Sequence, residues 1–499
     1  MTRYGQHKVG WQALRTNALA VLAARLLVPA CNIALVVIIA RGGGAGILGQ
    51  YTLLVTLFLL FENLKSLGLT TLLVRQVSQN HVVGLAQYRS LIRIGIAGAV
   101  IAAPLMCLVA AFSASASTAL LPAAALMSIG LIPSAYAMAG DALFLALNRA
   151  RLTLGVTLAE NLLRSCISLA ALRIWRGGVF DLVAVYVASR FFAVLAQKYL
   201  IVHYLRLRLP AYDWQITVDM LRRAPAFVTV FVSPLVLFRM DVVLLGVLAG
   251  DYQVGVYSAA ARLISLSLIV PDSIMTASFV QLSRLARADE QSPFQFLVDR
   301  TFELVTGTLT LITVTGALLA PVLIRLLYGP GFEEAVPVMQ TLLWALALFG
   351  ASRALGDALV ARGRQNSVAR IVLTTIGASA GLYLWLIRAH SVNGAAWAFV
   401  ASAAILCGLT LRQGLQRKVV GRVTMWRALL PLTACFAAFQ ITRFGASVRV
   451  MFALVCITAV VSITPVAWVL WSFWRDSRRP FAQGIAIESP VLTVQEEIA

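Results

Sequence analysis

The chain has 499 residues, of which 60% are hydrophobic and only 12% are charged, and its formal net charge is +21. Because soluble globular proteins carry roughly a quarter charged residues, this composition excludes that class and indicates an integral membrane protein. The positive charge would suggest a nucleic-acid partner in a soluble protein. In a membrane protein its meaning depends on how it is distributed around the spans.

Apolar stretches of membrane-spanning length, about 20 residues each, recur from residue 17 almost to the C-terminus. The first stretch, 17–41, is longer than the hydrophobic region of a cleavable signal peptide, and no small-x-small cleavage site follows it, so we expect a retained first span. The pattern predicts an all-α, polytopic membrane protein with about 14 transmembrane helices. Their expected ranges are 17–41, 49–74, 91–112, 119–147, 152–174, 180–204, 224–249, 255–282, 301–327, 335–360, 368–389, 392–412, 425–442 and 449–474.

The basic residues can be compared with this topology. With a cytoplasmic N-terminus, roughly 26 basic residues fall in inner segments and about 7 in outer ones, which is a strong positive-inside bias. The bias predicts that both termini are cytoplasmic. Much of the net positive charge therefore reflects the orientation of the spans in the membrane rather than a function.

The longest inner connection divides the chain. In it, Asp213 is a candidate N-cap followed by apolar residues at helical spacing, which predicts a short interfacial helix. We therefore expect an N-terminal six-helix lobe (1–204), a cytoplasmic linker with this helix (205–223), a C-terminal six-helix lobe (224–412), two additional transmembrane helices (425–474) and a disordered cytoplasmic tail (475–499).

A short internal repeat supports two lobes. Gly49 and Tyr51 recur as Gly255 and Tyr257, at an offset of 206 residues (255 minus 49), and each pair lies between the first and second span of its lobe. Six spans fall within this offset, so both copies have the same orientation. This favours pseudo-symmetric lobes, related by an axis along the membrane normal, around a central cavity.

About eight basic and six acidic residues fall at membrane depth, where each charge facing lipid costs on the order of 2.5 to 3.5 kcal/mol. Most of them must therefore face one another or an aqueous cavity. A spacing of three or four residues predicts local ion pairs on one helix face. These pairs are Glu62 with Lys65, Glu160 with Arg164, and Arg353 with Asp357.

The stretch "FRMDVVLLG", residues 238–246, places two opposite charges in a seventh span. Arg239 and Asp241 are two residues apart and point about 200° apart around a helix, so they cannot simply pair with each other. At least one of them must reach a neighbouring helix or the cavity. The sequence leaves both alternatives open.

Four basic residues at membrane depth have no local partner: Arg25, Arg190, Arg239 and Arg262. We expect them to converge on the central cavity as substrate-binding residues. Arginine binds phosphate oxygens through a bidentate fork, so a net-positive chamber suits an anionic substrate such as a lipid-linked phosphate or pyrophosphate.

Three carboxylates are candidates for binding a coupling ion, H⁺ or Na⁺: Glu62, Asp141 and Asp241. A structural ion pair is the alternative role for each of them. The six cysteines and four histidines lack metal-ligand spacing, and "RGGGAG" lacks the GK[ST] of a P-loop. We therefore expect no cofactor and no metal.

The run "FRMDVVLLGVLAGDYQVGVYSAAARL" resembles the start of the second half of bacterial polysaccharide flippases of the Wzx type, in the multidrug/oligosaccharidyl-lipid/polysaccharide exporter (MOP) superfamily. The later run "LIRLLYGPGFEEAVPVMQTLLWALALFGASRALGDALVARGRQ" is similar to the ninth and tenth spans of that family. The resemblance implies two six-helix lobes around a cavity. In it Arg25 and Arg262 lie on helices that carry cavity arginines in the lipid II flippases, and Asp241 with Arg239 resembles the charged pair that opens the second lobe.

The resemblance implies a transporter, not an enzyme, in the bacterial inner (cytoplasmic) membrane. Its substrate would be an undecaprenyl-pyrophosphate-linked oligosaccharide repeat unit, moved to the outer leaflet for exopolysaccharide, capsule or O-antigen assembly, with a polymerase and export machinery as partners. One alternative is a multidrug exporter of the same superfamily, although organic cations would favour an acidic chamber. Another is a membrane enzyme such as a polymerase, against which the short outer loops argue.

Overall fold

The computed structural model describes residues 11–421 apart from residues 80, 115–119, 207–211, 229–231, 289–290 and 418, and it describes no side chains for residues 11–26. The two predicted spans at 425–442 and 449–474 and the predicted tail at 475–499 lie outside the described residues. The regular elements of the described part are all helices. They are α1 (Trp11–Ser66), α2 (Thr70–Gln79), α3 (His81–Ala111), α4 (Leu120–Ile129), α5 (Leu131–Ala146), α6 (Ala150–Arg173), α7 (Val179–Tyr199), η1 (Leu200–Tyr204), α8 (Trp214–Phe227), α9 (Ser233–Leu237), α10 (Met240–Ala249), α11 (Asp251–Ser267), α12 (Ile269–Arg287), α13 (Gln291–Tyr328), η3 (Pro330–Phe332), α14 (Ala335–Ala361) and α15 (Gln365–Gln416).

Several of these helices have the length and apolar character of membrane spans. Within the described residues, six are long and apolar enough to cross a membrane, or seven if the bent pair α4 and α5 counts as one span. Two of the six, α1 with 56 residues and α15 with 52, are broken by a non-helical residue, Gly44 and Ser391 respectively. A straight helix of that size would be roughly 80 Å long against about 30 Å of hydrocarbon, so each break separates two spans.

The first twelve predicted spans each coincide with a helix, with half of a broken helix or with consecutive shorter helices. Span seven is interrupted between α9 and α10, and span eight between α11 and α12, which is why neither forms one long helix. The all-α, polytopic membrane fold predicted from the apolar pattern is therefore confirmed.

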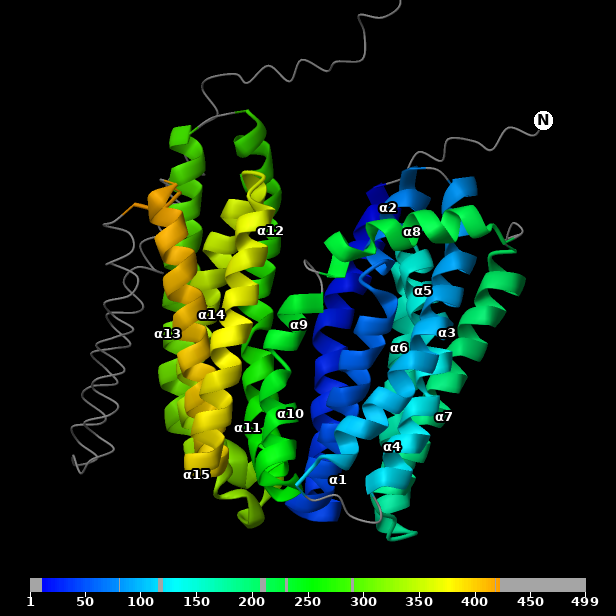
Figure 1. Ribbon diagram of the computed structural model, residues 1–499, viewed down its shortest axis with the longest axis vertical. Coiled ribbons are helices and arrows are strands. Elements are labelled where there is room, and N and C mark those ends of the chain that lie inside the picture. The colour runs from blue at the N-terminus through cyan, green and yellow to red at the C-terminus, as the bar shows by residue number, and fades with distance from the viewer. Residues whose placement is uncertain are drawn as a thin grey trace, which may run out of the picture.

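The helices form two lobes, α1–α7 and α9–α15 (Figure 1). In the view of Figure 1 the lobes diverge toward the end that carries α8 and meet at the opposite end, where α1 packs against α10, α11 and α13. The helix α8 follows the predicted N-cap, because the Asp213 side chain accepts a hydrogen bond from the Gln215 backbone N–H at 2.8 Å. Trp214, at its first position, is exposed, as expected for an interfacial helix.

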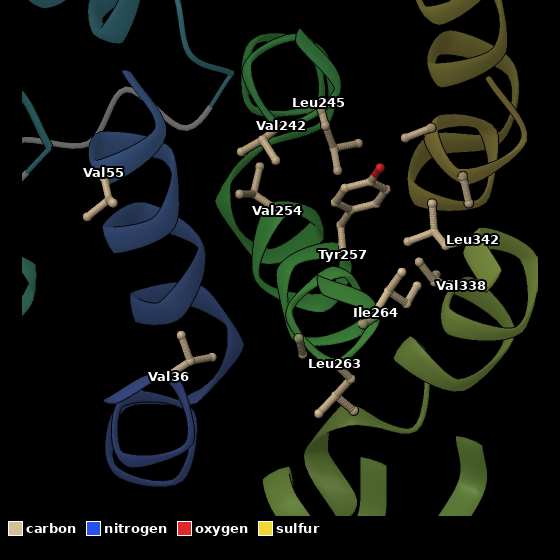
Figure 2. Packing of buried hydrophobic residues seen from close by; sticks show 14 of the residues in the cluster. Val36, Val55, Val242, Leu245, Val254, Tyr257, Leu263, Ile264, Val338 and Leu342 are labelled. Atoms are coloured by element: carbon tan, nitrogen blue, oxygen red, sulfur yellow. The ribbon is translucent and has the colours of Figure 1, made fainter. Parts of the chain in front are cut away.

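A continuous apolar core joins the lobes where they meet. In Figure 2, Val36 and Val55 of α1 lie on one side of Val254 of α11, and the Tyr257 ring points away from α1, toward the helices on the other side. All four side chains are buried. Contact between the lobes therefore depends on apolar packing.

The internal repeat is visible in the backbone. Gly44, at the turn within α1, has φ 74° and ψ −176°, and Gly250, at the turn between α10 and α11, has φ 88° and ψ 176°. Glycine is essentially the only residue that adopts this conformation. The two turns are separated by 206 residues (250 minus 44), which is also the separation of Gly49 and Gly255. The two lobes thus begin their second spans with the same turn.

Candidate functional site

A cavity of about 320 Å³ lies where the two lobes face each other. Most of its wall comes from the N-terminal lobe, namely from α1, α5, α6 and α7, and the C-terminal lobe contributes Arg239 and Arg262. Four arginines and two carboxylates line it, so positive charge is in excess: Arg164, Arg190, Arg239, Arg262, Asp141 and Glu160. Such a cavity is suited to an anion.

On the N-terminal side the charges form an alternating chain. Glu62 pairs with Arg190 at 2.9 Å, and the second terminal nitrogen of Arg190 lies 3.6 Å from Glu160. Glu160 also pairs with Arg164, whose Nε donates to the Ser189 hydroxyl at 3.0 Å. Each arginine in this chain has at least one carboxylate partner. We call these four charged residues, Glu62, Arg190, Glu160 and Arg164, the ion-pair chain.

Aromatic rings hold the arginines of the ion-pair chain in place. The Arg164 guanidinium lies 4.0 Å from the centroid of the Tyr186 ring, and that of Arg190 lies 5.9 Å from the same centroid. Tyr186 in turn meets Phe58 edge to face, with centroids 5.2 Å apart. Such cation–π and aromatic contacts restrict rotation of the charged side chains.

On the C-terminal side the arginines have no such partners. Arg239 directly precedes α10, and Arg262 lies on α11. Among the described residues, neither forms an ion pair with a carboxylate. Both line the cavity opposite the ion-pair chain, so their charge is available to a ligand.

The paired charges of "FRMDVVLLG" have separate roles. The Asp241 carboxylate accepts a hydrogen bond from the Tyr257 hydroxyl at 2.7 Å and one from the Val242 N–H at 2.7 Å. Asp241 is buried and is absent from the cavity wall, whereas Arg239 lines it. Asp241 thus reaches the neighbouring helix α11 and Arg239 reaches the cavity, so each of the two alternatives left open by the sequence holds for one residue.

Two of the expected pairing patterns are wrong. Arg190 was expected to be unpaired, but α7 brings it against Glu62 and Glu160. Glu62 was expected to pair with Lys65, but the Lys65 ammonium instead donates to the Leu131 carbonyl and to a serine hydroxyl on α5. Spacing along one helix could not reveal these partners because they come from other helices.

Two other predicted pairs are confirmed. Glu160 pairs with Arg164 one turn along α6, and Arg353 pairs with Asp357 at 3.2 Å on α14. Arg353 also lies 3.8 Å from Asp272 of α12. The pair on α14 lies away from the cavity wall, with Arg353 exposed and Asp357 partly buried.

The structure brings together three of the four predicted substrate-binding arginines, namely Arg190, Arg239 and Arg262. The fourth, Arg25, is on α1 in the segment for which no side chains are described. Of the coupling-ion candidates, Asp141 alone lines the cavity, where it accepts a hydrogen bond from the Gln197 side chain at 3.0 Å.

Sequence reasoning missed several residues of the cavity wall. Arg164 was assigned only to a local ion pair, yet it also lines the cavity, as do Tyr51 and the amides Asn32, Asn161 and Gln197. Amide side chains in otherwise apolar spans were a usable signal for these positions, since they too must be satisfied away from lipid. In the described part of the chain, no group of three or more His, Cys, Asp and Glu side chains could hold a metal ion.

Two helical lobes that face each other across a charged chamber, in an all-α membrane protein, define a transporter or flippase fold. A family model described as "Polysaccharide biosynthesis protein" matches residues 14–285, and the chain belongs to this family. The polysaccharide-assembly family expected from the sequence is thereby confirmed. Comparison with curated proteins found no match.

Solved structures support the same fold. A lipid II flippase MurJ in an inward closed conformation is 14% identical with a TM-score of 0.66, and the match covers 93% of this chain and 100% of that one. A multidrug resistance MATE family transporter in an inward-facing conformation is 11% identical with a TM-score of 0.64, covering 79% of this chain and 98% of the transporter. An outward-facing MATE structure, also 11% identical, has a TM-score of 0.53 over 81% of this chain and 95% of that one.

Proposed function

We propose that this protein is a flippase that moves an undecaprenyl-pyrophosphate-linked oligosaccharide repeat unit from the inner to the outer leaflet of the bacterial cytoplasmic membrane. The transported unit would serve exopolysaccharide, capsule or O-antigen assembly, with a polymerase and export machinery acting after it. Membership of a polysaccharide biosynthesis family and a transporter fold with a cationic cavity support this proposal.

The observation that carries the proposal is the state of Arg239 and Arg262. Both reach the cavity from the C-terminal lobe, and neither has a carboxylate partner among the residues described. A guanidinium binds phosphate through two parallel hydrogen bonds, so two free guanidinium groups suit the two phosphates of a pyrophosphate. The arginines of the ion-pair chain are already neutralised and would contribute field and shape instead.

The size of the cavity agrees with a headgroup-sized ligand. Its volume of about 320 Å³ lies at the lower end of ligand pockets. This accommodates the pyrophosphate and its neighbouring sugar, with the rest of the repeat unit extending beyond the wall. The polyprenyl chain would remain in the bilayer throughout, so its apolar surface would not be exposed to water during transfer.

Alternating access would move the headgroup. In the proposed topology, with both termini cytoplasmic, the end that carries α8 faces the cytoplasm, and the end where α1 meets α11 faces outward (Figure 1). Opening between the lobes at the inner end admits the substrate, and opening at the outer end releases it. Coupling to H⁺ or Na⁺ is part of the proposal, with Asp141 as the carboxylate that lies at the cavity.

The first experiment is leaflet-specific labelling of lipid-linked oligosaccharide in cells that lack the protein. Completed repeat units should accumulate on the inner leaflet. Arg262→Gln should restore folded protein but not export, whereas Arg388→Gln, which removes an exposed charge on α15, should restore both. Normal transfer to the outer leaflet in the deleted strain would refute the proposal.

Two further measurements separate the alternatives. Resistance to cationic dyes on overexpression, with transfer of the lipid-linked sugar unchanged, would indicate a multidrug exporter. Joining of sugar units by the purified protein in detergent, where no second compartment exists, would indicate a polymerase.

A further inference from the structure

At the end of the molecule where Gly44 and Gly250 lie, the backbones of the two lobes come unusually close together. The backbones of α1 and α11 approach so closely there that a Cβ atom built on Gly49 would lie 1.7 Å from the Asp251 carbonyl oxygen. A Cβ atom built on Gly255 would lie 1.9 Å from the Ala45 carbonyl oxygen. Real Cβ atoms essentially never come within 3.0 Å of such an atom, so only glycine permits this approach.

The two close approaches are equivalent by the internal repeat. The offset from Ala45 to Asp251 is 206 residues (251 minus 45), as is the offset from Gly49 to Gly255 (255 minus 49). Each lobe therefore places a glycine against a backbone carbonyl of the other lobe. Gly49 lies against the carbonyl of Asp251, and Gly255 lies against that of Ala45. We call Ala45, Gly49, Asp251 and Gly255 the glycine joint.

Hydrogen bonds surround the glycine joint and cross between the lobes. The Gln50 amide donates to the Asp251 carboxylate at 2.9 Å. The Ser113 hydroxyl at the end of α3 donates to the Gly246 carbonyl of α10 at 3.0 Å. Both of these bonds have neutral donors. Such a contact has defined geometry but modest strength.

One cation also bridges the lobes at this end. Arg41, which precedes the turn at Gly44, donates through Nε to the Leu327 carbonyl at 2.8 Å and through Nη2 to the Leu326 carbonyl at 2.5 Å. These carbonyls belong to the last turn of α13, which ends at Tyr328. The C-terminal turn of a helix has unpaired carbonyls with partial negative charge, so it favours a cation.

We propose that the glycine joint, with Arg41 and Gln50, is a latch that holds the cavity closed at this end and has to release for the lobes to open there. The Arg41 contact can separate without leaving a buried unpaired charge, because Arg41 is exposed and its acceptors are backbone carbonyls. The alternative is a permanent pivot, about which the lobes rotate while this contact stays intact. The inference rests on the proposed function only for the statement that this end faces outward.

The test measures access to the cavity from this end. All six native cysteines are replaced, and Thr157, which lines the cavity, becomes the single reporter in Thr157→Cys. Membrane-impermeant thiol reagent is applied to the full-length protein in intact cells and in inverted vesicles. A separate single cysteine at Arg176→Cys shows which side of the membrane this end faces, since Arg176 is exposed on the loop that follows α6, at the end where Gly42 meets Leu172.

In the latch, Gly49→Ala and Gly255→Ala prevent close approach and shift the lobes toward opening. Overpacking at the glycine joint destabilises the closed state relative to the open state. Labelling of the Thr157→Cys reporter from this end should therefore rise about fivefold or more. Arg41→Gln, which adds no atoms to the joint, should raise it by a smaller factor. The matched control is Gly46→Ala, three residues before Gly49 on the same helix, where an added Cβ meets nothing within 4 Å.

The outcomes are decisive in both directions. A rise in Gly49→Ala, Gly255→Ala and Arg41→Gln, with Gly46→Ala unchanged, supports the latch. Unchanged labelling in Arg41→Gln together with a loss of folded protein in both glycine variants would identify a permanent pivot and overturn the inference. The readout is accessibility and needs no transported lipid, so a failure of the proposed substrate would leave this result intact.

Discussion

The ion-pair chain allows a stability prediction in which the size of the loss depends on which member is removed. In Arg190→Gln, Glu62 loses its cation partner while its side chain stays only 5% exposed. Removing one partner of a buried ion pair typically costs about 3–5 kcal/mol. Because the Arg190 side chain is 16% exposed, and water can therefore reach Glu62 through the space it leaves, we expect the lower limit, about 3 kcal/mol.

The reverse change should cost less. In Glu62→Gln, Arg190 keeps Glu160 at 3.6 Å, so its charge stays compensated, and we expect a loss of about 1–2 kcal/mol. In the double variant, Glu160 still pairs with Arg164 and no charge is left without a partner. The double variant should therefore be more stable than Arg190→Gln alone, which is a favourable coupling between neighbouring residues.

Unfolding of the purified protein in mixed micelles, followed by intrinsic tryptophan fluorescence, measures these differences. Arg388→Gln, at an exposed arginine on α15, serves as the control for loss of a positive charge. The reasoning is refuted if the double variant is as unstable as Arg190→Gln, or if Glu62→Gln is the more damaging single change. Either result would mean that the Glu62 charge is compensated by a group other than Arg190.

Two other predictions concern single contacts. Tyr257→Phe removes the hydroxyl that donates to Asp241 and leaves this buried carboxylate with one hydrogen bond fewer, so the same unfolding assay should show a loss of about 1–3 kcal/mol; a variant as stable as the wild type would contradict the role of that bond. Gly44→Ala and Gly250→Ala force a side chain into a backbone conformation that is essentially limited to glycine, and each should lower the midpoint of thermal denaturation by an amount equivalent to about 1–3 kcal/mol, whereas Gly46→Ala should not; equal effects in all three would exclude backbone strain as the cause.

The fold could be predicted from the sequence to a large extent because the bilayer imposes a length on every span. The turn within α1 and the turn before α11 separate apolar runs of the expected length, and glycine at Gly44 and Gly250 marks both of them. Gly49 and its equivalent mark the repeat for the same reason, since only glycine fits the close approach. Backbone requirements of this kind leave a signature in the sequence.

The partners of the embedded charges could be predicted only where they lie on one helix. Glu160 and Arg164 are one turn apart and were paired correctly, but Glu62 belongs to α1 and Arg190 to α7. Which helices become neighbours depends on packing in three dimensions, and a single sequence does not record it. The same limit explains why Arg190 was expected to be free, although its place at the cavity was predicted.

The glycine joint has the geometry of an isologous dimer interface, in which each partner presents to the other the surface that it receives. In a true homodimer any substitution occurs twice, so both halves of the interface change together. In one continuous chain, a substitution can occur in one half of the interface alone. The residue equivalent to Arg41 in the second lobe is Val247 (41 plus 206), and the bridging cation is accordingly present on one side alone. A symmetric interface can thus carry a one-sided, charge-dependent contact, which two identical subunits would be unable to encode.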